Sequence, residues 1–467
     1  MLFNSIPYLF FLPVTLLVYR IISLAYRHYF LLFASYVFYA WYNPWFSLLL
    51  FSTTMVDFFC GNKISDSPNA KNKKAWLVFS IGSNIAVLFF FKYAVFFANT
   101  GIGLLNWIGY TQYSFFNQLI IPAGLSFYTF QSLAYIIDIY RKKINPAKNF
   151  SEYALFVSFF PQLVAGPVER FQNLSPQINQ PTTTKMVDYP LAMRLITWGF
   201  FKKMVLADRL ADLINPVFTS PELYSGSTLL LFGFLFAVQV YGDFSGYTDI
   251  ASGTAKLFGI NLCLNWRRPL LSTSVANFWK RNHISITSWF RDYLYISLGG
   301  NKVKKTRWAL NILVVFLISG LWHGANWTFI VWAILHAVFF LLEYFVSEKY
   351  KFNFPAFTSW LYFILFHSFS MLAFRANSIT DLWEIYSSVC MNFDLFAFKN
   401  ELLSLQHLFP LMLTGGVILL FFMKELQEEF NFFRLNNLSR SVFYISILLL
   451  IFLIGNFNAN EFVYFQF

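Results

Sequence analysis

The sequence predicts an all-α protein that crosses a membrane many times, and its composition supports this in three ways. Hydrophobic residues make up 57% of the 467 residues and charged residues only 12%. The mean hydropathy is +0.54, and 62 Phe, 26 Tyr and 14 Trp are present. Soluble globular proteins lack this combination, because helices that are apolar on nearly every face need lipid or other buried helices around them. We therefore expect roughly 11–12 transmembrane helices, with additional re-entrant and interfacial helices.

The charges and cysteines exclude several other classes. A net charge of +12 would favour nucleic-acid binding in a soluble protein, but in a membrane protein it indicates basic cytoplasmic loops. The three cysteines, Cys60, Cys263 and Cys390, lie far apart and have no metal-site or disulfide spacing, so we expect no metal. The amino terminus lacks a basic segment and a cleavage site, which predicts a retained first helix rather than a signal peptide.

The distribution of basic residues predicts the orientation in the membrane. Residues 1–19 are uncharged and the first basic residue is Arg20, which places the amino terminus outside by the positive-inside rule. The loops around 63–74 and 141–148 are rich in Lys and Arg, whereas residues 98–112 form an uncharged outer loop. Continuing this alternation along the chain places the carboxyl terminus outside as well.

Apolar runs predict the individual helices in the first and last parts of the chain. A helix break is expected at Asn43-Pro44, because proline is disfavoured inside a helix. The run 153–168 is about 16 residues long, shorter than the roughly 20 needed to span, so it is predicted to be buried or re-entrant. The break divides 28–56 into a hairpin pair of short helices, and the other expected helices are 1–19, 75–97, 113–139, 352–374, 402–423 and 441–456, with an acidic outer loop over 376–401.

The middle of the chain is less regular. Residues 190–217 mix apolar and charged positions, which predicts a helix at the cytoplasmic surface with its charges on a solvated face. At 239–249, glycines and the carboxylates of Asp243 and Asp249 are predicted to break a helix. Such a break is tolerated where it lines a cavity; alternatively, the two carboxylates pair with a nearby Arg or Lys as structural contacts.

A helical period over 274–298 predicts a helix in the cytoplasmic interface that carries His283 on its apolar face and ends at Gly299-Gly300. The basic residues of 302–307 follow directly. They fit either an anionic ligand or ordinary anchoring to anionic lipid.

Two histidines lie in a run, 308–342, that has no formally charged residue. Because ionisable groups at membrane depth are costly, His323 and His336 are candidates for function. The alternative is a core histidine that is hydrogen-bonded to a neighbouring helix. Since His336 follows thirteen residues after His323, roughly opposite it on one helix, we expect His336 to be structural.

Five spaced motifs combine glycine, proline, aromatic and histidine residues. They are PAGLSFYTFQ (122–131), FFPQLVAGP (159–167), QVYGDFSGYTD (239–249), the segment from NFW to GGN (277–301) and LWHGANW (321–327). Together these motifs resemble the membrane-bound O-acyltransferase (MBOAT) superfamily, in particular its bacterial alginate O-acetylation branch. The resemblance implies the MBOAT fold, with helices around a central passage. No repeat or linker divides the chain, so we expect one integral domain over 1–467, comprising amino-terminal helices (1–112), a motif-bearing core (113–346) and carboxyl-terminal helices (347–467).

The resemblance also implies site residues. The near-invariant histidine of the superfamily corresponds to His323, and its second conserved polar position, a histidine in this branch, corresponds to His283. Asn282 stands where relatives usually have Trp, a departure that affects the surroundings of His283. The ending FVYFQF (462–467) resembles a motif of this branch in which Tyr464 would be an acyl relay; the alternative is a packing or docking motif.

These residues support a mechanism in which the acyl group crosses the membrane while its carrier does not. Acetyl-CoA is too polar to cross lipid, so the thioester must meet an acceptor hydroxyl inside the protein. Burial favours a neutral imidazole, which suits His323 as general base, and His283 would orient the donor or its carbonyl. The residues expected to shape or line the passage are Trp322, Asn326, Trp327, Tyr241 and Asp243.

We therefore predict an O-acyltransferase in a bacterial cytoplasmic (inner) membrane. It would move acetyl groups from cytoplasmic acetyl-CoA, a donor substrate rather than a tightly bound cofactor, to an extracytoplasmic acceptor for O-acetylation of alginate, peptidoglycan, cellulose or a similar surface polysaccharide. Membrane lipid and an extracytoplasmic acyltransferase or esterase-like protein are the expected partners, and nucleic acid is not. The alternatives are transfer of D-alanyl or another acyl group, a transporter or flippase of acylated or glycan precursors, and a non-catalytic scaffold.

Overall fold

The computed structural model describes residues 1–41, 43–107, 120–179, 187–350, 355–405, 408–432 and 436–457. Throughout these ranges the regular elements are helices, as the composition predicts. They group into two compact units, one formed by residues 1–193 and 251–263 and the other by 194–250 and 264–467. The single domain expected from the sequence stays a prediction, because compact grouping of helices does not by itself define a domain.

Among the described residues, eight helices are long and apolar enough to cross a membrane, which confirms the multi-pass class. The predicted number of crossings was larger because several apolar runs form shorter helices, such as α1 (Ile6–Ile21) with 16 residues. The eight candidate spans are α3 (Pro44–Asp66), Ala70–Ala98, α12 (Gly226–Leu257), α15 (Lys305–His323), α16 (Trp327–Tyr350), α17 (Ala356–Arg375), α20 (Leu408–Phe430) and α21 (Asn437–Ile454).

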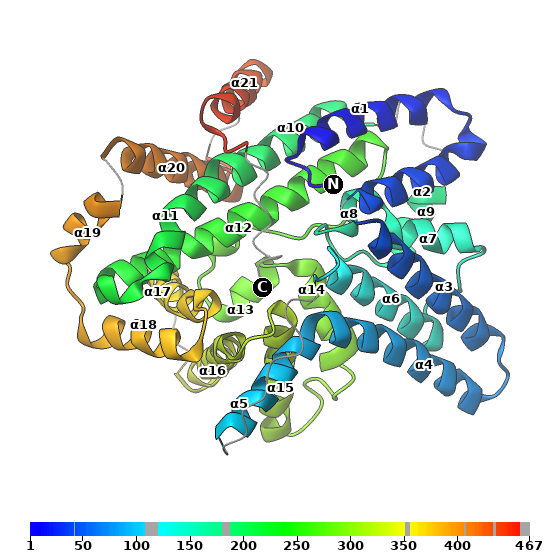
Figure 1. Cartoon of the computed structure of the whole chain (residues 1–467), viewed down its shortest axis with the longest axis horizontal. Coiled ribbons are helices and arrows are strands. Elements are labelled where there is room, and N and C mark those ends of the chain that lie inside the picture. Colours follow the sequence, from blue (N-terminus) through cyan, green and yellow to red (C-terminus); the bar gives the residue numbers. More distant parts are fainter. Residues whose placement is uncertain are drawn as a thin grey trace. The chain divides into compact units, whose positions relative to one another are not determined.

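In the first unit, α3, α4 and α6 pack side by side (Figure 1). A buried polar contact joins α3 to α4, because Asp57 Oδ1 accepts hydrogen bonds from Ser80 Oγ at 2.6 Å and from Asn84 Nδ2 at 2.8 Å. The remaining elements of this unit are α2 (Leu24–Ala40), α4 (Ala70–Leu88), η1 (Phe89–Tyr93), α5 (Ala94–Trp107), α6 (Leu125–Tyr140), α7 (Phe150–Ser158), α8 (Phe160–Leu163) and α9 (Phe171–Asn179).

Two predictions for this unit are confirmed and one is wrong. The break at Asn43-Pro44 is present, and the Asn43 side chain caps α3 by accepting from Trp45 N at 3.0 Å. Residues 153–168 form the short, buried helices α7 and α8 instead of a crossing. The loop predicted over 98–112 is wrong as far as Trp107, because α5 continues to that residue, and the rest of it lies outside the described residues. An uncharged sequence is equally compatible with helix.

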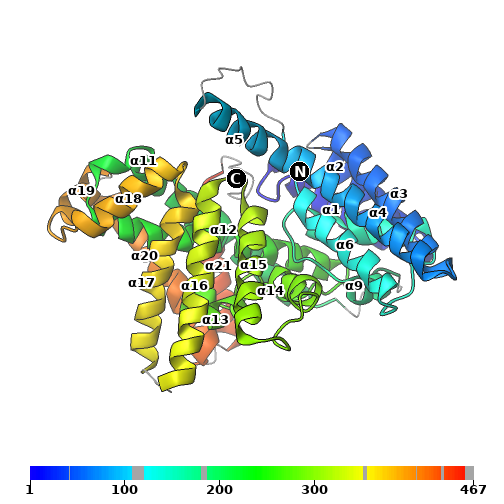
Figure 2. The same cartoon turned by 90° about the horizontal axis from the view of Figure 1, so that it is seen from below.

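In the second unit, α15, α16 and α17 lie side by side (Figure 2). The predicted outer loop over 376–401 contains the helix α18 (Ile379–Met391), which Ser378 caps by accepting from Asp381 N at 3.0 Å. The other elements are α10 (Tyr189–Phe200), η3 (Phe201–Ala207), α11 (Asp208–Thr219), η4 (Pro221–Leu223), η5 (Pro269–Leu271), α13 (Val275–Arg281), α14 (Ile284–Trp289), η6 (Phe290–Tyr295) and α19 (Ala397–Leu405).

The helix break predicted at 239–249 is wrong, because α12 runs without interruption over 32 residues. Its glycines serve close packing instead of a break. A Cβ atom on Gly246 would lie 2.8 Å from the carbonyl oxygen of Gly199 and 3.0 Å from Lys203 N. Only glycine therefore allows η3 to approach α12 this closely.

The solvated charged face predicted for 190–217 is also wrong at Lys202 and Lys203, which are both buried. Lys203 Nζ lies 2.7 Å from Asp243 Oδ1 and 2.9 Å from Asp208 Oδ1, and Lys202 Nζ lies 2.6 Å from Asp249 Oδ2. The alternative in which the two α12 carboxylates pair with nearby basic residues is therefore confirmed. Burial is tolerated because each charge has a partner of opposite sign.

The single helix predicted over 274–298 is divided into α13, α14 and η6. The division falls at His283, which has a left-handed backbone with φ of 44° and ψ of 53°. Local periodicity cannot reveal such a break. The predicted helical segment ends near Gly299 and Gly300, as expected, and both glycines have positive φ.

The uncharged run 308–342 forms two helices, α15 and α16, instead of the single helix on which His323 and His336 were placed. The chain reverses at Gly324–Asn326, and Asn326 Oδ1 accepts from Thr328 N at 3.1 Å at the start of α16. The helices pack tightly, since a Cβ on Gly320 would lie 2.7 Å from Ala333 Cβ.

Candidate active site

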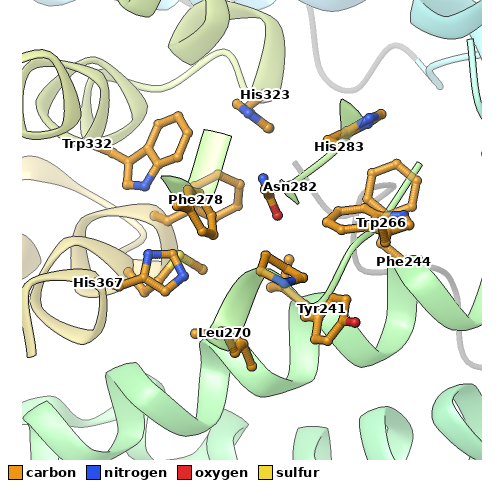
Figure 3. A pocket seen from close by; sticks show the side chains of 15 residues that line it. Tyr241, Phe244, Trp266, Leu270, Phe278, Asn282, His283, His323, Trp332 and His367 are labelled. Atoms are coloured by element: carbon orange, nitrogen blue, oxygen red, sulfur yellow. The ribbon is translucent and has the colours of Figure 1, made fainter. Parts of the chain in front are cut away.

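A small cavity in the second unit brings together three histidines from three separate segments of the chain (Figure 3). Its volume is about 50 Å³, and its walls are mostly aromatic and aliphatic. The lining residues are Ala237, Val240, Tyr241, Phe244, Trp266, Pro269, Leu270, Phe278, Asn282, His283, His323, Trp332, His367, Met371 and Phe374. The few polar groups among them are therefore the candidates for chemistry.

His323 is the last residue of α15, where the helix ends before the turn to α16. Its imidazole is held among three aromatic rings, with centroid distances of 4.8 Å to Trp322, 4.9 Å to Trp332 and 5.2 Å to Phe374. Its side of the cavity is therefore shielded from water, while the residue itself lines the cavity. This position at the cavity wall suits a residue that acts as a general base on a group bound in the cavity.

His283 begins α14, and Asn265 fixes its orientation. Asn265 Oδ1 accepts from Ser285 N at 3.2 Å and from Ser285 Oγ at 2.8 Å, so this oxygen also accepts from His283 Nδ1, 3.2 Å away. Nδ1 therefore carries the proton, and Nε2 keeps its lone pair. Burial lowers the pKa of His283 to about 3, so the ring is neutral at physiological pH.

His367 comes from near the middle of α17 and was not singled out from the sequence. Its ring lies 4.7 Å from that of Phe278 and 5.4 Å from that of Phe363, measured between centroids. His336 is fully buried, and its Nε2 is 3.2 Å from Ser370 Oγ. Because Ser370 Oγ donates to the His367 carbonyl at 2.8 Å, His336 donates to Ser370, an arrangement that suits the structural role expected for it.

Three other predicted site residues, Tyr241, Asp243 and Trp322, differ in whether they line the cavity. Tyr241 lines the cavity with its ring, and its hydroxyl donates to Glu425 Oε2 at 2.7 Å. Asp243 is not among the lining residues, because it is paired with Lys203. Trp322 lies behind the cavity, with its ring 5.7 Å from that of His283.

Asn326 and Trp327 lie at the turn between α15 and α16 rather than around the cavity. Asn326 Nδ2 donates to the Asn377 carbonyl at 2.8 Å. Trp327 is 49% exposed, which in a membrane protein fits contact with lipid or the interface. Tyr464 lies outside the described residues, so its role as an acyl relay stays a prediction.

Three polar residues that line the cavity were not predicted to do so from the sequence: His367, Trp332 and Asn282. His367 was the one with a detectable signal, because an ionisable residue within a predicted crossing is unusual. Within the described ranges, no cluster of three or more His, Cys, Asp or Glu side chains is arranged to hold a metal ion, and this includes the three cavity histidines.

The fold and the cavity define a multi-pass membrane protein with imidazoles gathered among aromatic residues, an arrangement suited to acid–base chemistry on a small group. Comparison with known proteins identifies the family. The model of the membrane-bound O-acyltransferase family (MBOAT) matches residues 147–382, which include His283 and His323. The chain belongs to this family and is an O-acyltransferase, as its motifs predict.

Three relatives show how far the similarity extends. The chain is 37% identical over 396 residues to the probable alginate O-acetylase AlgI of Pseudomonas aeruginosa, which covers 83% of this chain and 75% of that protein. It is 35% identical over 392 residues to the protein of the same name from Azotobacter vinelandii, covering 83% and 78%. It is 32% identical over 420 residues to the peptidoglycan O-acetyltransferase of Helicobacter pylori, covering 82% and 79%.

Proposed function

We propose that this protein transfers acetyl groups from acetyl-CoA to a hydroxyl group, as one step in the O-acetylation of a bacterial cell-surface polysaccharide. The observation that carries the proposal is the joint placement of His323 and His283 at one enclosed cavity. The names of the relatives, alginate O-acetylases and a peptidoglycan O-acetyltransferase, support the chemical class of the acceptor. The cytoplasmic membrane is the proposed location, with the donor taken from the cytoplasm and both termini outside.

The size of the cavity supports a short acyl group. A volume of about 50 Å³ has room for a few water-sized groups, since roughly 10–15 Å³ of such cavity volume is needed to hold one water. The carbonyl and methyl groups of an acetyl group are on this scale, whereas a long acyl chain is not. The aromatic wall also keeps water away from the thioester, which limits wasteful hydrolysis.

In the proposed reaction His323 is the general base. Its imidazole takes the proton from the acceptor hydroxyl while the hydroxyl oxygen attacks the thioester carbon. A C–O bond forms, the C–S bond breaks, and the proton passes to the departing sulfur to give the free thiol of CoA and an acetyl ester. General base catalysis of this kind contributes about 100- to 10,000-fold in rate.

His283 acts as a positioning residue for the donor. Its Nδ1–H is engaged by Asn265, so the ring is held in one orientation and Nε2 keeps its lone pair. With its pKa lowered to about 3 by burial, it contributes no positive charge and serves as an acceptor. A donor N–H group, such as an amide of the pantetheine arm of acetyl-CoA, is a suitable partner.

The acceptor that leaves with the acetyl group is either Tyr464 of this chain or a serine of an extracytoplasmic partner enzyme that acts on the polysaccharide. Mass spectrometry of the protein after incubation with labelled acetyl-CoA separates the two. A label on Tyr464 that disappears in Tyr464→Phe, together with loss of transfer, supports the relay. Full activity with no label on Tyr464 would leave the carboxyl-terminal motif as a packing or docking segment.

The proposed function is tested by acetyl-CoA turnover in purified protein reconstituted into vesicles. His323→Ala should lower transfer by about 100-fold or more while the variant keeps its thermal unfolding midpoint. His336→Gln is the control variant. Glutamine keeps a side-chain amide able to donate to Ser370, whereas alanine does not. Near wild-type transfer by His323→Ala would refute the assignment. Turnover of D-alanyl thioesters in preference to acetyl-CoA would instead identify D-alanyl transfer as the activity.

A further inference from the structure

Two cavity residues carry hydrogen-bond donors that the mechanism has not used. Trp332, in α16, is 3% exposed and lines the cavity, and its Nε1 has no hydrogen-bond partner among the described residues. The Asn282 side chain also lines the cavity, and Figure 3 draws its carboxamide below His323, between Phe278 and Trp266. Buried N–H groups are nearly always paired in native proteins, so an unpaired indole N–H at a cavity wall indicates an acceptor that arrives with a ligand.

The Trp332 ring and the Asn282 backbone are held in place by the surrounding structure. The Trp332 ring packs edge-on against His323, with 4.9 Å between centroids, and against Phe374 at 5.2 Å. The Asn282 backbone is fixed at both ends, because its N–H donates to the Phe278 carbonyl at 2.8 Å and its carbonyl accepts from Thr287 Oγ1 at 3.1 Å. Rigid donors of this kind need little reorganisation when charge develops on a substrate.

Both donors line the same small cavity, whose volume is about 50 Å³, so an acceptor atom that enters it approaches the two side chains from one space. The neighbouring side chains offer no competing negative charge, since the lining residues include no Asp or Glu.

We propose that Trp332 Nε1–H and the Asn282 carboxamide bind the carbonyl oxygen of the acyl thioester and stabilise the oxyanion that forms on it. This inference rests on the proposed acyl transfer at His323 and adds the groups that bind the carbonyl. When the acceptor oxygen attacks the thioester carbon, the carbonyl π electrons move to oxygen, and the two donors hold that negative charge. When the C–S bond breaks, the electrons return and the carbonyl re-forms in the ester product.

The test uses the full-length protein in vesicles, with acetyl-CoA as donor. Trp332→Phe keeps the aromatic ring and removes the N–H, and Asn282→Leu keeps the approximate size and removes the amide. We expect each to lower kcat by about 100-fold or more and to change KM for acetyl-CoA by less than about threefold, as for loss of a donor that acts mainly in the transition state.

Trp279→Phe is a matched control. Trp279 Nε1 is also buried without a hydrogen-bond partner among the described residues, and its ring packs against Trp332 at 5.9 Å, but Trp279 does not line the cavity. Trp279→Phe removes the same atoms from a residue that does not line the cavity, so kcat should stay within about threefold of wild type.

A spectroscopic readout separates carbonyl binding from a general effect on the fold. In the His323→Ala background, which holds the donor without turnover, acetyl-CoA labelled with ¹³C at the carbonyl should show a lowered C=O stretching frequency. Adding Trp332→Phe or Asn282→Leu should return this frequency towards its value in solution, and adding Trp279→Phe should not.

The outcomes are distinct. Wild-type kcat and an unchanged carbonyl frequency in Trp332→Phe and Asn282→Leu would overturn this inference alone, provided that His323→Ala is inactive. Equal losses in Trp279→Phe and Trp332→Phe would also overturn it, because they would show a packing effect. If the wild-type protein transfers no acetyl group, the proposed function and this inference fail together.

Discussion

Replacing Asn265 tests whether the placement of His283 depends on one buried side chain. Asn265 is 1% exposed, and its Oδ1 accepts three hydrogen bonds, from His283 Nδ1 and from the backbone and hydroxyl of Ser285. Asn265→Leu keeps a similar volume and leaves those three donors without this acceptor. The Ile284 N–H would still donate to the Asn265 carbonyl at 2.8 Å, so the backbone link beside the left-handed His283 remains.

The loss of unfolding free energy in Asn265→Leu depends on how many buried donors are left without an acceptor. Each buried donor left unpaired costs about 1–3 kcal/mol, but the Ser285 hydroxyl can rotate to another acceptor. Asn265 Nδ2 already has no partner among the described residues, so leucine also removes one unpaired donor. The net loss of unfolding free energy is therefore about 2–4 kcal/mol, compared with about 1 kcal/mol for Ser285→Ala, which removes only one of the three bonds.

Thermal unfolding in detergent and acetyl-CoA turnover in vesicles measure the two consequences. Asn265→Leu should lower the unfolding midpoint more than Ser285→Ala does. It should also lower turnover by about 10-fold or more at a temperature where both variants are folded, because the imidazole is no longer held. A variant with an unchanged midpoint and full turnover would refute the argument that Asn265 fixes His283.

Three further predictions follow from the ion pairs, the cavity and the buried imidazole. Lys203→Met should lower the unfolding free energy by about 3–5 kcal/mol in chemical unfolding, because the carboxylates of Asp208 and Asp243 stay buried without the lysine. A stability equal to that of wild type would contradict this prediction. Met371→Ala enlarges the cavity, so the ratio of propionyl-CoA to acetyl-CoA turnover should rise about 10-fold; an unchanged ratio would mean that this wall does not limit acyl length. Burial lowers the pKa of His283 from 6.5 to about 3, so below pH 6.5 the unfolded chain binds a proton that the folded chain does not. Stability should therefore fall by about 1.4 kcal/mol per pH unit from this residue between pH 6.5 and 3, and His283→Gln should remove that part of the acid sensitivity in pH-dependent unfolding.

Several features of the fold could be predicted because they depend on composition or on a few adjacent residues. Long apolar runs with few charges must lie in lipid, whatever their tertiary packing, so the multi-pass helical class followed directly. The break at Asn43-Pro44 is a local steric consequence of proline. The motifs around His283 and His323 identified the family, which the comparisons confirm, while the catalytic roles of these two residues stay predictions.

Other features depend on what packs against each segment, and local sequence does not contain that information. Glycines at 242 and 246 are as compatible with a helix break as with a close contact, and only the approach of η3 decides for the contact. Lys202 and Lys203 resemble a solvated face until α12 brings the carboxylates of Asp249 and Asp243 within 2.6–2.7 Å of them. A lysine is buried or exposed according to its partners rather than its own spacing.

The candidate site shows the same division. Its two expected histidines were identified from the sequence itself, because an imidazole in an apolar motif is unusual and the motif is shared with a family. The third histidine, His367, and Trp332 reach the same cavity from α17 and α16, and Asn282 reaches it from the link between α13 and α14, so chain folding brings these groups to His323. The sequence by itself determined that this is a membrane acyltransferase with His323 as its first candidate base. The tertiary structure decided which other groups surround that base, because they are far apart along the chain and meet only when the helices pack.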